Sequence, residues 1–381
     1  MTKGQLSPDQ FEQKTVLDKY QFNQQDDEID LKELVVALWQ GKFTIIAVTV
    51  ICTAIAIAYA FLAKEKWTTE VIVTVPQVSD YSAYQKMVND FQPVFDVYQD
   101  DGTIIFSKKL DDFLLPGNLF QILIQQYQSR ANKKEFISSS LDFQVELKNL
   151  QNDFKGEGYK DAEASLYKKW YQKLTENVIN SKSNYVLYTL QGVQENAEKS
   201  LDFLNEYIKY IEIKAQNIAL ANLKAIVEGK RGELIQQKAL LEGQAMRRLQ
   251  SERELTKYAL QIAKAAGVSQ PQQNLGNQEL FAINIGSSAL EAKMKVLDSL
   301  SINQFGIIVP RLQIVDAKMS LLDSLDISAG ASFRTFRYIE SPEMPLGRTS
   351  PKRPLIAIVG VLLGGMIGCF IVLSRFAFRE K

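Results

Sequence analysis

The chain contains no histidine and only two cysteines in 381 residues. Without an imidazole it has neither histidine zinc sites nor the serine–histidine and cysteine–histidine pairs on which many hydrolases depend near neutral pH. Cys52 and Cys369 both lie inside long apolar runs, so neither is placed to form a disulfide framework or a reactive thiolate in water. The composition therefore argues against an enzyme.

An excess of charge of either sign is also missing. The 44 Lys and Arg residues balance 44 Asp and Glu residues, so no overall field attracts the chain to nucleic acid. The sequence lacks a glycine-rich phosphate loop, a metal-ligand cluster and a nucleophile with an adjacent base. Acidic pairs such as Asp111–Asp112 could suggest a glycosidase, but such pairs arise by chance and usually face solvent. We expect no catalytic residue, no cofactor, no metal and no nucleic-acid partner.

Two long runs without a charge, residues 43–63 and 355–373, dominate the hydropathy. About 20 apolar residues cross the hydrocarbon core of a bilayer as a helix, so each run predicts a membrane span. A cleaved signal peptide is disfavoured for the first run because 42 mostly polar residues precede it. The predicted plan is a tail, a span, one large loop, a second span and a short tail, with both ends on the same side.

The charges beside the spans leave the orientation open. Equal numbers of Lys and Arg flank the spans on the terminal side and on the loop side, and long loops cross membranes largely regardless of charge. The size of the loop is a better guide to the orientation than the charges beside the spans. A large domain in residues 64–354 beside two short tails is typical of a protein that works outside the cytoplasm.

A short amphipathic helix is expected just before the first span. Apolar residues recur at helical spacing from Leu31 to Leu38. Trp39 would then lie at the depth of the lipid headgroups, where an indole is favoured. The simpler alternative is that this segment is only the frayed start of the span.

The two ends of the loop predict a small α/β base. Residues 67–75 alternate in a strand pattern, and residues 333–339 are rich in β-forming side chains. Because these segments adjoin the two spans, we expect them to pair antiparallel. Residues 185–190 are a third predicted strand. Helices are predicted around residues 83–91, 119–128 and 162–177.

The middle of the chain predicts a long helical arm. No proline occurs between Pro116 and Pro271, and residues 194–266 are continuous helix-forming sequence with an apolar stripe. As one helix this segment would be about 110 Å long, too long for burial in a compact domain. A break near Gly229–Gly232 is the alternative, since glycine weakens a helix by about 1 kcal/mol relative to Ala. The predicted tip turn and the two returning helices are residues 269–278, 287–301 and 310–325.

The most specific segment precedes and enters the second span. Its prolines hold an extended connector, and glycines at i, i+4 and i+8 form a stripe that lets another helix approach closely. A shorter stripe of two alanines lies on the first span. The alternative is that glycine is simply common in membrane helices. The candidate residues are Pro342, Pro345, Ser350, Pro351 and Lys352 in the connector, Gly360, Gly364, Gly365, Met366 and Gly368 in the second span, and Ala54 and Ala58 in the first span.

This segment resembles the signature of the bacterial polysaccharide co-polymerases, the Wzz-type chain-length determinants. The run Pro-x2-Pro-x4-Ser-Pro-Lys-x11-Gly-Gly-Met-x-Gly, residues 342–368, is similar to the family signature almost residue by residue. Asp27–Leu31 with Leu38–Trp39 looks like the family's N-terminal motif. One departure is visible at Cys369–Phe370, where the family usually has Ala-Gly, and the bulkier Phe370 bears on close packing there.

The resemblance implies an α+β membrane protein in which two transmembrane helices bracket a periplasmic α/β base with a long helical arm. It implies a non-enzymatic regulator in the inner membrane of Gram-negative bacteria. Such proteins assemble as ring-like homo-oligomers and act with an integral-membrane polymerase to set the modal length of O-antigen or a related glycan. A lipid-linked glycan is a further expected partner. The alternative is a membrane adaptor of a capsule or exopolysaccharide export system that works with a separate tyrosine kinase.

These predictions divide the chain into seven segments. They are a cytoplasmic tail with the amphipathic helix (1–42), the first span (43–63), the periplasmic base (64–193), the arm with its return helices (194–326), a base strand with the proline-rich connector (327–354), the second span (355–373) and a cytoplasmic tail (374–381).

Overall fold

The computed structural model describes residues 31–99, 101–179, 186–271, 281–327 and 332–379. The N-terminal motif predicted at Asp27–Asp30, most of the predicted tip turn and Tyr185 lie outside these ranges. The chain divides into two compact units, Met1–Glu65 with Arg348–Lys381, and Lys66–Gly347. Each unit is described by itself.

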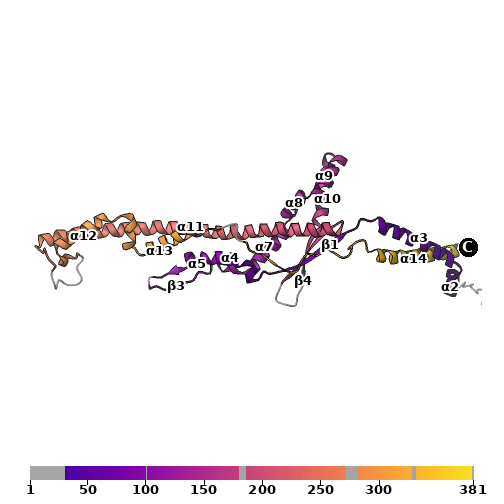
Figure 1. Cartoon of the computed structure of the whole chain (residues 1–381), viewed down its shortest axis with the longest axis horizontal. Coiled ribbons are helices and arrows are strands. Elements are labelled where there is room, and N and C mark those ends of the chain that lie inside the picture. Colours follow the sequence, from indigo (N-terminus) through magenta and orange to yellow (C-terminus); the bar gives the residue numbers. More distant parts are fainter. Residues whose placement is uncertain (1–30, 100, 180–185, 272–280, 328–331, 380–381) are drawn as a thin grey trace, which may run out of the picture. The chain divides into compact units, whose positions relative to one another are not determined.

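The first unit consists of two long apolar helices and a short helix before them (Figure 1). Helix α2 spans Leu31–Gln40, α3 spans Lys42–Leu62 and α14 spans Arg353–Arg379. Both long helices are long and apolar enough to cross a membrane, and only 6% and 22% of their most apolar windows is buried within the chain. The core helix of a soluble protein would bury its apolar side chains. The two predicted spans are therefore present as helices with largely exposed apolar surfaces.

Helix α2 is distinct from the first span. A turn at Gly41 separates it from α3, and α2 leaves the axis of α3 at an angle (Figure 1). Val35, Val36 and Trp39 are exposed. An exposed apolar surface on a short helix suits the membrane interface, so the structure favours a separate amphipathic helix over a frayed start of the span.

The second unit begins and ends in one four-stranded sheet with the order β4-β5-β1-β6. All three neighbouring pairs are antiparallel. Val73 lies opposite Tyr338, which is the pairing predicted for the two ends of the loop. The predicted third strand is β5, between β4 and β1. The strands are β1 (Trp67–Thr74), β4 (Leu174–Ile179), β5 (Leu187–Gln194) and β6 (Arg337–Glu340).

The second unit also contains several helices besides this sheet. The predicted helical segments correspond to α4 (Val78–Asp90), α7 (Pro116–Gln128) and α10 (Glu157–Tyr171). The prediction that the last of them reaches residue 177 is wrong, because β4 begins at Leu174 and pairs with β5. Elements without a prediction are α5 (Gln92–Phe95), α6 (Asp111–Leu114), α8 (Arg130–Ser139), α9 (Leu141–Asp153) and the hairpin of β2 (Val97–Tyr98) and β3 (Ile104–Ile105).

Helix α11 spans Ala197–Ala265, 69 residues without interruption, which corresponds to about 100 Å at the rise of an α-helix. The Asn196 side chain caps its start by accepting a hydrogen bond from Lys199 N at 2.7 Å. The alternative of a break near Gly229–Gly232 is wrong. Both glycines lie on an open surface of the helix, while Val227 and Leu234 on either side of them are buried. Packing on the other face therefore keeps the helix continuous.

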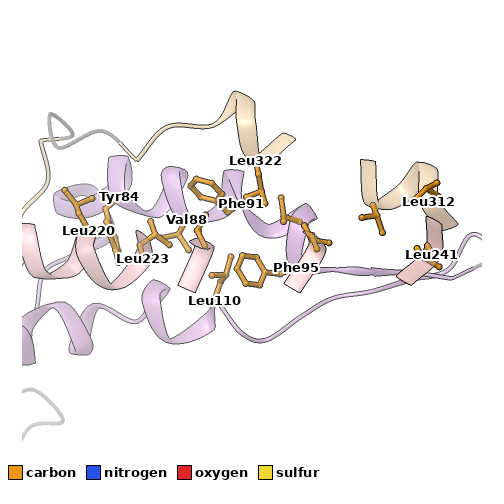
Figure 2. Packing of buried hydrophobic residues seen from close by; sticks show 14 of the residues in the cluster. Tyr84, Val88, Phe91, Phe95, Leu110, Leu220, Leu223, Leu241, Leu312 and Leu322 are labelled. Carbon is orange, nitrogen blue, oxygen red and sulfur yellow. The ribbon is translucent and has the colours of Figure 1, made fainter. Parts of the chain in front are cut away.

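The chain returns along α11 in two helices. They are α12 (Ser287–Ser299) and α13 (Arg311–Ser324), each preceded by a short 3-10 helix, η3 (Ile283–Ile285) and η4 (Ile302–Ile307). Figure 2 shows Leu322 of α13, Leu223 of α11 and Phe91 beside α4 in one buried cluster. The return helices and the α4–α5 segment thus cover the apolar stripe of α11. The α+β fold class with a long helical arm is confirmed, and the finer division into seven segments stays a prediction.

The start of α11 is fastened to the sheet by a buried polar contact. Ser200 Oγ donates to the Gly192 carbonyl oxygen at 2.8 Å and accepts from Thr69 N at 2.9 Å. A Cβ on Gly192 would stand only 2.8 Å from Leu204 Cβ. Glycine at this position therefore permits the close approach of helix and strand.

Candidate functional site: the transmembrane helix pair and its connector

The glycine stripe of α14 faces α3 within the first unit. Gly360, Gly364 and Gly368 are all buried. A Cβ added to Gly364 would stand 2.8 Å from Thr49 Cα, and one added to Gly368 would stand 2.9 Å from Ile45 Cα. Such distances leave no room for a side chain, so the glycines bring the two backbones into direct contact. Packing of this kind drives helix association in lipid, where apolar burial offers no advantage.

Other predicted stripe residues lie away from this contact. A Cβ on Gly365 would meet no atom within 4 Å, and Met366 is exposed. Ala54 and Ala58 are exposed as well, so the alanine stripe predicted on the first span is not the surface that meets the glycines. The glycines meet a different face of α3, to which Ala56 contributes, and a packing role for Ala54 and Ala58 stays a prediction.

The surface of α3 that meets the glycines contains two threonines that the sequence analysis did not select. Thr53 Cα would stand 3.3 Å from a Cβ on Gly360. The Thr53 hydroxyl donates to the Thr49 carbonyl oxygen at 2.7 Å, and the Thr49 hydroxyl donates to the Ile45 carbonyl oxygen at 2.8 Å. Each hydroxyl is thereby satisfied inside its own helix, as an apolar environment requires. The spacing of Thr49, Thr53 and Ala56 is the sequence signal that could have located this face.

A charged cluster joins the membrane-proximal ends of the two spans. Glu65 Oε1 accepts hydrogen bonds from Arg348 Nη1 at 2.8 Å and from Arg353 Nη2 at 3.0 Å. Arg353 Nε also donates to the Ala60 carbonyl oxygen at 3.3 Å, and its guanidinium lies 4.2 Å from the centroid of the Phe61 ring. The planar guanidinium combines these contacts in a way that a lysine ammonium does not. The cluster holds the end of α3 to the start of α14. A lone acidic residue just after the first span, and arginines just before the second, were its sequence signal.

The connector residues occupy an irregular segment before α14. Pro342 and Pro345 are half-buried and belong to the second unit, whereas Ser350, Pro351 and Lys352 belong to the first. The Ser350–Pro351 peptide bond is cis. The Lys352 carbonyl accepts from Ile356 N at 3.1 Å, which starts the helix. The connector therefore spans the boundary between the two units, with its prolines outside regular structure.

The site is a packing and anchoring arrangement. Its contacts are backbone to backbone, hydroxyl to carbonyl and guanidinium to carboxylate. Among the residues that the structure describes, no group of three or more His, Cys, Asp or Glu is placed to hold a metal ion. What the arrangement can do chemically is hold two membrane helices together and fix the exit of the chain from the membrane.

Known proteins are similar to this chain over most of its length. A family model described as "Wzz: Chain length determinant protein" matches residues 27–140. A chain length determinant protein of Shigella dysenteriae is 29% identical over 368 residues, which cover 94% of this chain and 95% of the relative.

Solved structures are also similar. A full-length bacterial polysaccharide co-polymerase is 26% identical with a TM-score of 0.63, and the alignment covers 93% of this chain and 99% of that one. The wild-type Shigella flexneri lipopolysaccharide O-antigen chain-length regulator WzzBSF is 20% identical, with a TM-score of 0.50 over 74% of this chain and 99% of its own, which shows a shared fold. A Wzz protein described as a dodecamer is 19% identical, with a TM-score of 0.44 over 74% of this chain and 100% of its own.

Proposed function

Since this chain is a relative of the Wzz chain length determinants over 94% of its length, we propose that it regulates the modal chain length of O-antigen or a related surface polysaccharide. It acts as a co-polymerase beside an inner-membrane polymerase, and it is a regulator, not an enzyme. The relationship along nearly the whole chain is the single observation that carries the proposal. It also bears out the resemblance predicted from the connector and the second span.

The architecture supports a scaffolding role. Two helices that suit membrane spans flank one large domain in the sequence, and they pack closely against each other along Gly360, Gly364 and Gly368. Within the described ranges, no group of three or more His, Cys, Asp or Glu is placed to hold a metal ion. We include the glycine stripe and the proline connector in the proposal as the parts through which the domain is held at the membrane. The polymerase and a lipid-linked glycan are its proposed partners there, and the domain is placed in the periplasm.

The protein is further proposed to act as a homo-oligomer, in a ring-like assembly. The second unit leaves large apolar side chains exposed at two places, Ile105 and Phe106 at the hairpin and Ile235 and Met246 on α11. These exposed side chains are the proposed contacts between neighbouring copies in such an assembly.

The test is a comparison of surface polysaccharide on a gel from a strain that lacks the protein, from its parent and from the complemented strain. We expect the deletion strain to make polymer whose preferred length is lost, and complementation to restore that length. Complete absence of polymer in the deletion strain would contradict a regulatory role. The alternative of an export adaptor that works with a separate kinase predicts polymer retained inside the cell with its length distribution unchanged.

A further inference from the structure

A groove on the arm is lined by polar and charged side chains together with several apolar ones. It runs between α11, α13 and the chain around β2, and it consists of two adjoining cavities of about 590 and 980 Å³. Gln99, Arg311 and Ile314 line both cavities, which makes the groove continuous. A groove of this size accommodates a chain of several sugar rings or a comparable ligand.

Cationic groups outnumber acidic groups along the groove. The acids are Asp96, Asp101 and Glu233. One oxygen of the Asp96 carboxylate, Oδ1, accepts from Ser107 N at 2.9 Å and from Gln92 Nε2 at 2.6 Å. The cationic residues are Lys230, Arg247, Arg248, Arg311 and Lys318.

Lys230 and Lys318 both line one end of the groove. Lys230 is paired with Glu233 at 2.8 Å, and its side chain is only 11% exposed. Burial, together with the neighbouring charge of Lys230, lowers the pKa of Lys318 from its ordinary value. Lys318 Nζ donates to the Asp96 carbonyl oxygen and lies 5.2 Å from the centroid of the Tyr98 ring. Asp96 and Glu233 oppose the lowering of the pKa of Lys318, and a bound anion would add a further opposite charge beside the two ammonium groups.

The middle and the other end of the groove are also positive. Helix α13 begins at Arg311, which lines the groove, and its first turn has neither a side-chain cap nor an acidic residue to offset the positive end of the helix dipole. Arg247 is exposed, and among the described residues it makes no hydrogen bond or ion pair. Its guanidinium is therefore available to bind a carboxylate or a phosphate with two parallel hydrogen bonds.

The remaining lining side chains suit hydroxyl groups. Gln237, Gln244 and Ser251 lie on the α11 side, and amides offer both donors and an acceptor to vicinal hydroxyls. Tyr98 adds a partly exposed ring. Acidic groups and hydroxyls in one extended ligand are the chemistry of an acidic sugar chain.

We propose that this groove binds a segment of glycan that carries carboxylate or phosphate groups. The inference rests on the proposed function, which brings a growing polysaccharide to this protein. It adds a binding site on the arm and the chemical class of its ligand.

The test is calorimetric titration of the full-length protein in lipid nanodiscs. The probes are an oligogalacturonate, a neutral maltooligosaccharide of the same length and inorganic phosphate. We expect the oligogalacturonate to bind, with an affinity that falls as salt is raised, and the neutral sugar to bind at least about tenfold more weakly, since a charge-assisted hydrogen bond contributes about 1.5–3 kcal/mol. Equal binding of the two sugars would overturn the proposal. Binding of inorganic phosphate as tight as that of the oligogalacturonate would also overturn it, because the site would then hold a small anion only.

Two variants locate the ligand, with a matched control. Arg247→Gln and Lys318→Gln should each weaken oligogalacturonate binding about tenfold, while Lys257→Gln, an exposed cation on the same helix but outside the groove, should leave it unchanged. Unchanged affinity in both groove variants overturns the proposal. A change in the mass of the assembly that light scattering measures for either variant, relative to the wild type, also overturns it, because the groove would then be a contact between copies. Because binding is measured on purified protein, its failure is distinguishable from failure of the proposed function, which the polysaccharide gel reports.

Discussion

Lys173 shows how a single side chain in the base makes stability depend on pH. Its Nζ lies 3.4 Å from the centroid of the Trp170 ring and donates to Gln194 Oε1 at 3.1 Å. Burial lowers its pKa to about 8, below the ordinary value of 10.5, although nearby acids partly oppose the shift. Below pH 8 the folded and unfolded states both carry the proton. Between about pH 8 and 10.5 the folded state has released it and the unfolded state has not, so stability rises with pH in this window.

Replacing Lys173 by Met should remove that dependence. We expect the free energy of unfolding of the wild type, relative to Lys173→Met, to rise by about 1–2 kcal/mol between pH 7.5 and 10, after allowance for the solvent-exposed part of the side chain. Urea unfolding of the purified protein followed by circular dichroism measures the difference. Lys160→Met, on the exposed surface of α10, is the control and should keep the wild-type slope. Parallel curves for wild type and Lys173→Met would show that burial of this ammonium has no effect on its titration.

At the scale of elements, the contact between α3 and α14 is the feature most sensitive to a small change. A Cβ at position 364 would already stand 2.9 Å from Cys52 Cβ and 2.8 Å from Thr49 Cα. The neighbours are main-chain atoms and a short side chain, so they have little freedom to move aside. Glycine also costs helix propensity at each position, and the close approach of α3 is the physical reason for three of them on one face.

Gly364→Leu should therefore separate the two spans. Overpacking of this kind costs about 1–3 kcal/mol, while the span stays apolar enough to insert. We expect length control to weaken although the protein is made at normal level in the membrane. A polysaccharide gel beside an immunoblot of the membrane fraction measures both. Val361→Leu is the control, since Val361 is exposed and leaves the glycines clear. A wild-type length distribution in both variants would mean that the contact has no part in function.

At the scale of the whole molecule, the orientation in the membrane is inferred from the size of the segment between the two spans. The large domain lies between the two spans in the sequence, and the charges beside the spans are balanced. The size of the loop, and not its charge, therefore indicates on which side of the membrane the domain lies. The termini are expected in the cytoplasm and the domain in the periplasm.

Reporter fusions check this arrangement. Alkaline phosphatase, which is active only outside the cytoplasm, should be active when fused after Gln272 and inactive when fused after Lys381. The reverse pattern would place the domain in the cytoplasm and would exclude contact with a periplasmic glycan. Fusion of a cytoplasmic reporter at the same two positions should give the opposite pair of results.

The sequence by itself determined the features that depend on neighbouring residues. Hydropathy located α3 and α14, because crossing a membrane requires only a continuous apolar run. Helix-forming sequence located α11 within a few residues, because its hydrogen bonds join residues four apart. The strand pattern of β1 and the β-rich segment 333–339, which overlaps β6 from Arg337 onward, were visible for the same local reason. Their pairing followed from their positions beside the two spans.

Only the tertiary structure decided what depends on distant parts of the chain. Residues 174–177 form a strand because β5 supplies partners for their backbone groups. The glycine stripe meets Thr49, Thr53 and Ala56 and not the stripe of Ala54 and Ala58, because which face of α3 meets α14 depends on the packing of both helices and not on the small residues of one. Gly229 and Gly232 leave α11 unbroken since buried contacts on the opposite face hold it. The Glu65 cluster and the groove between α11 and α13 join residues far apart in sequence, and a local pattern contains no information about such contacts.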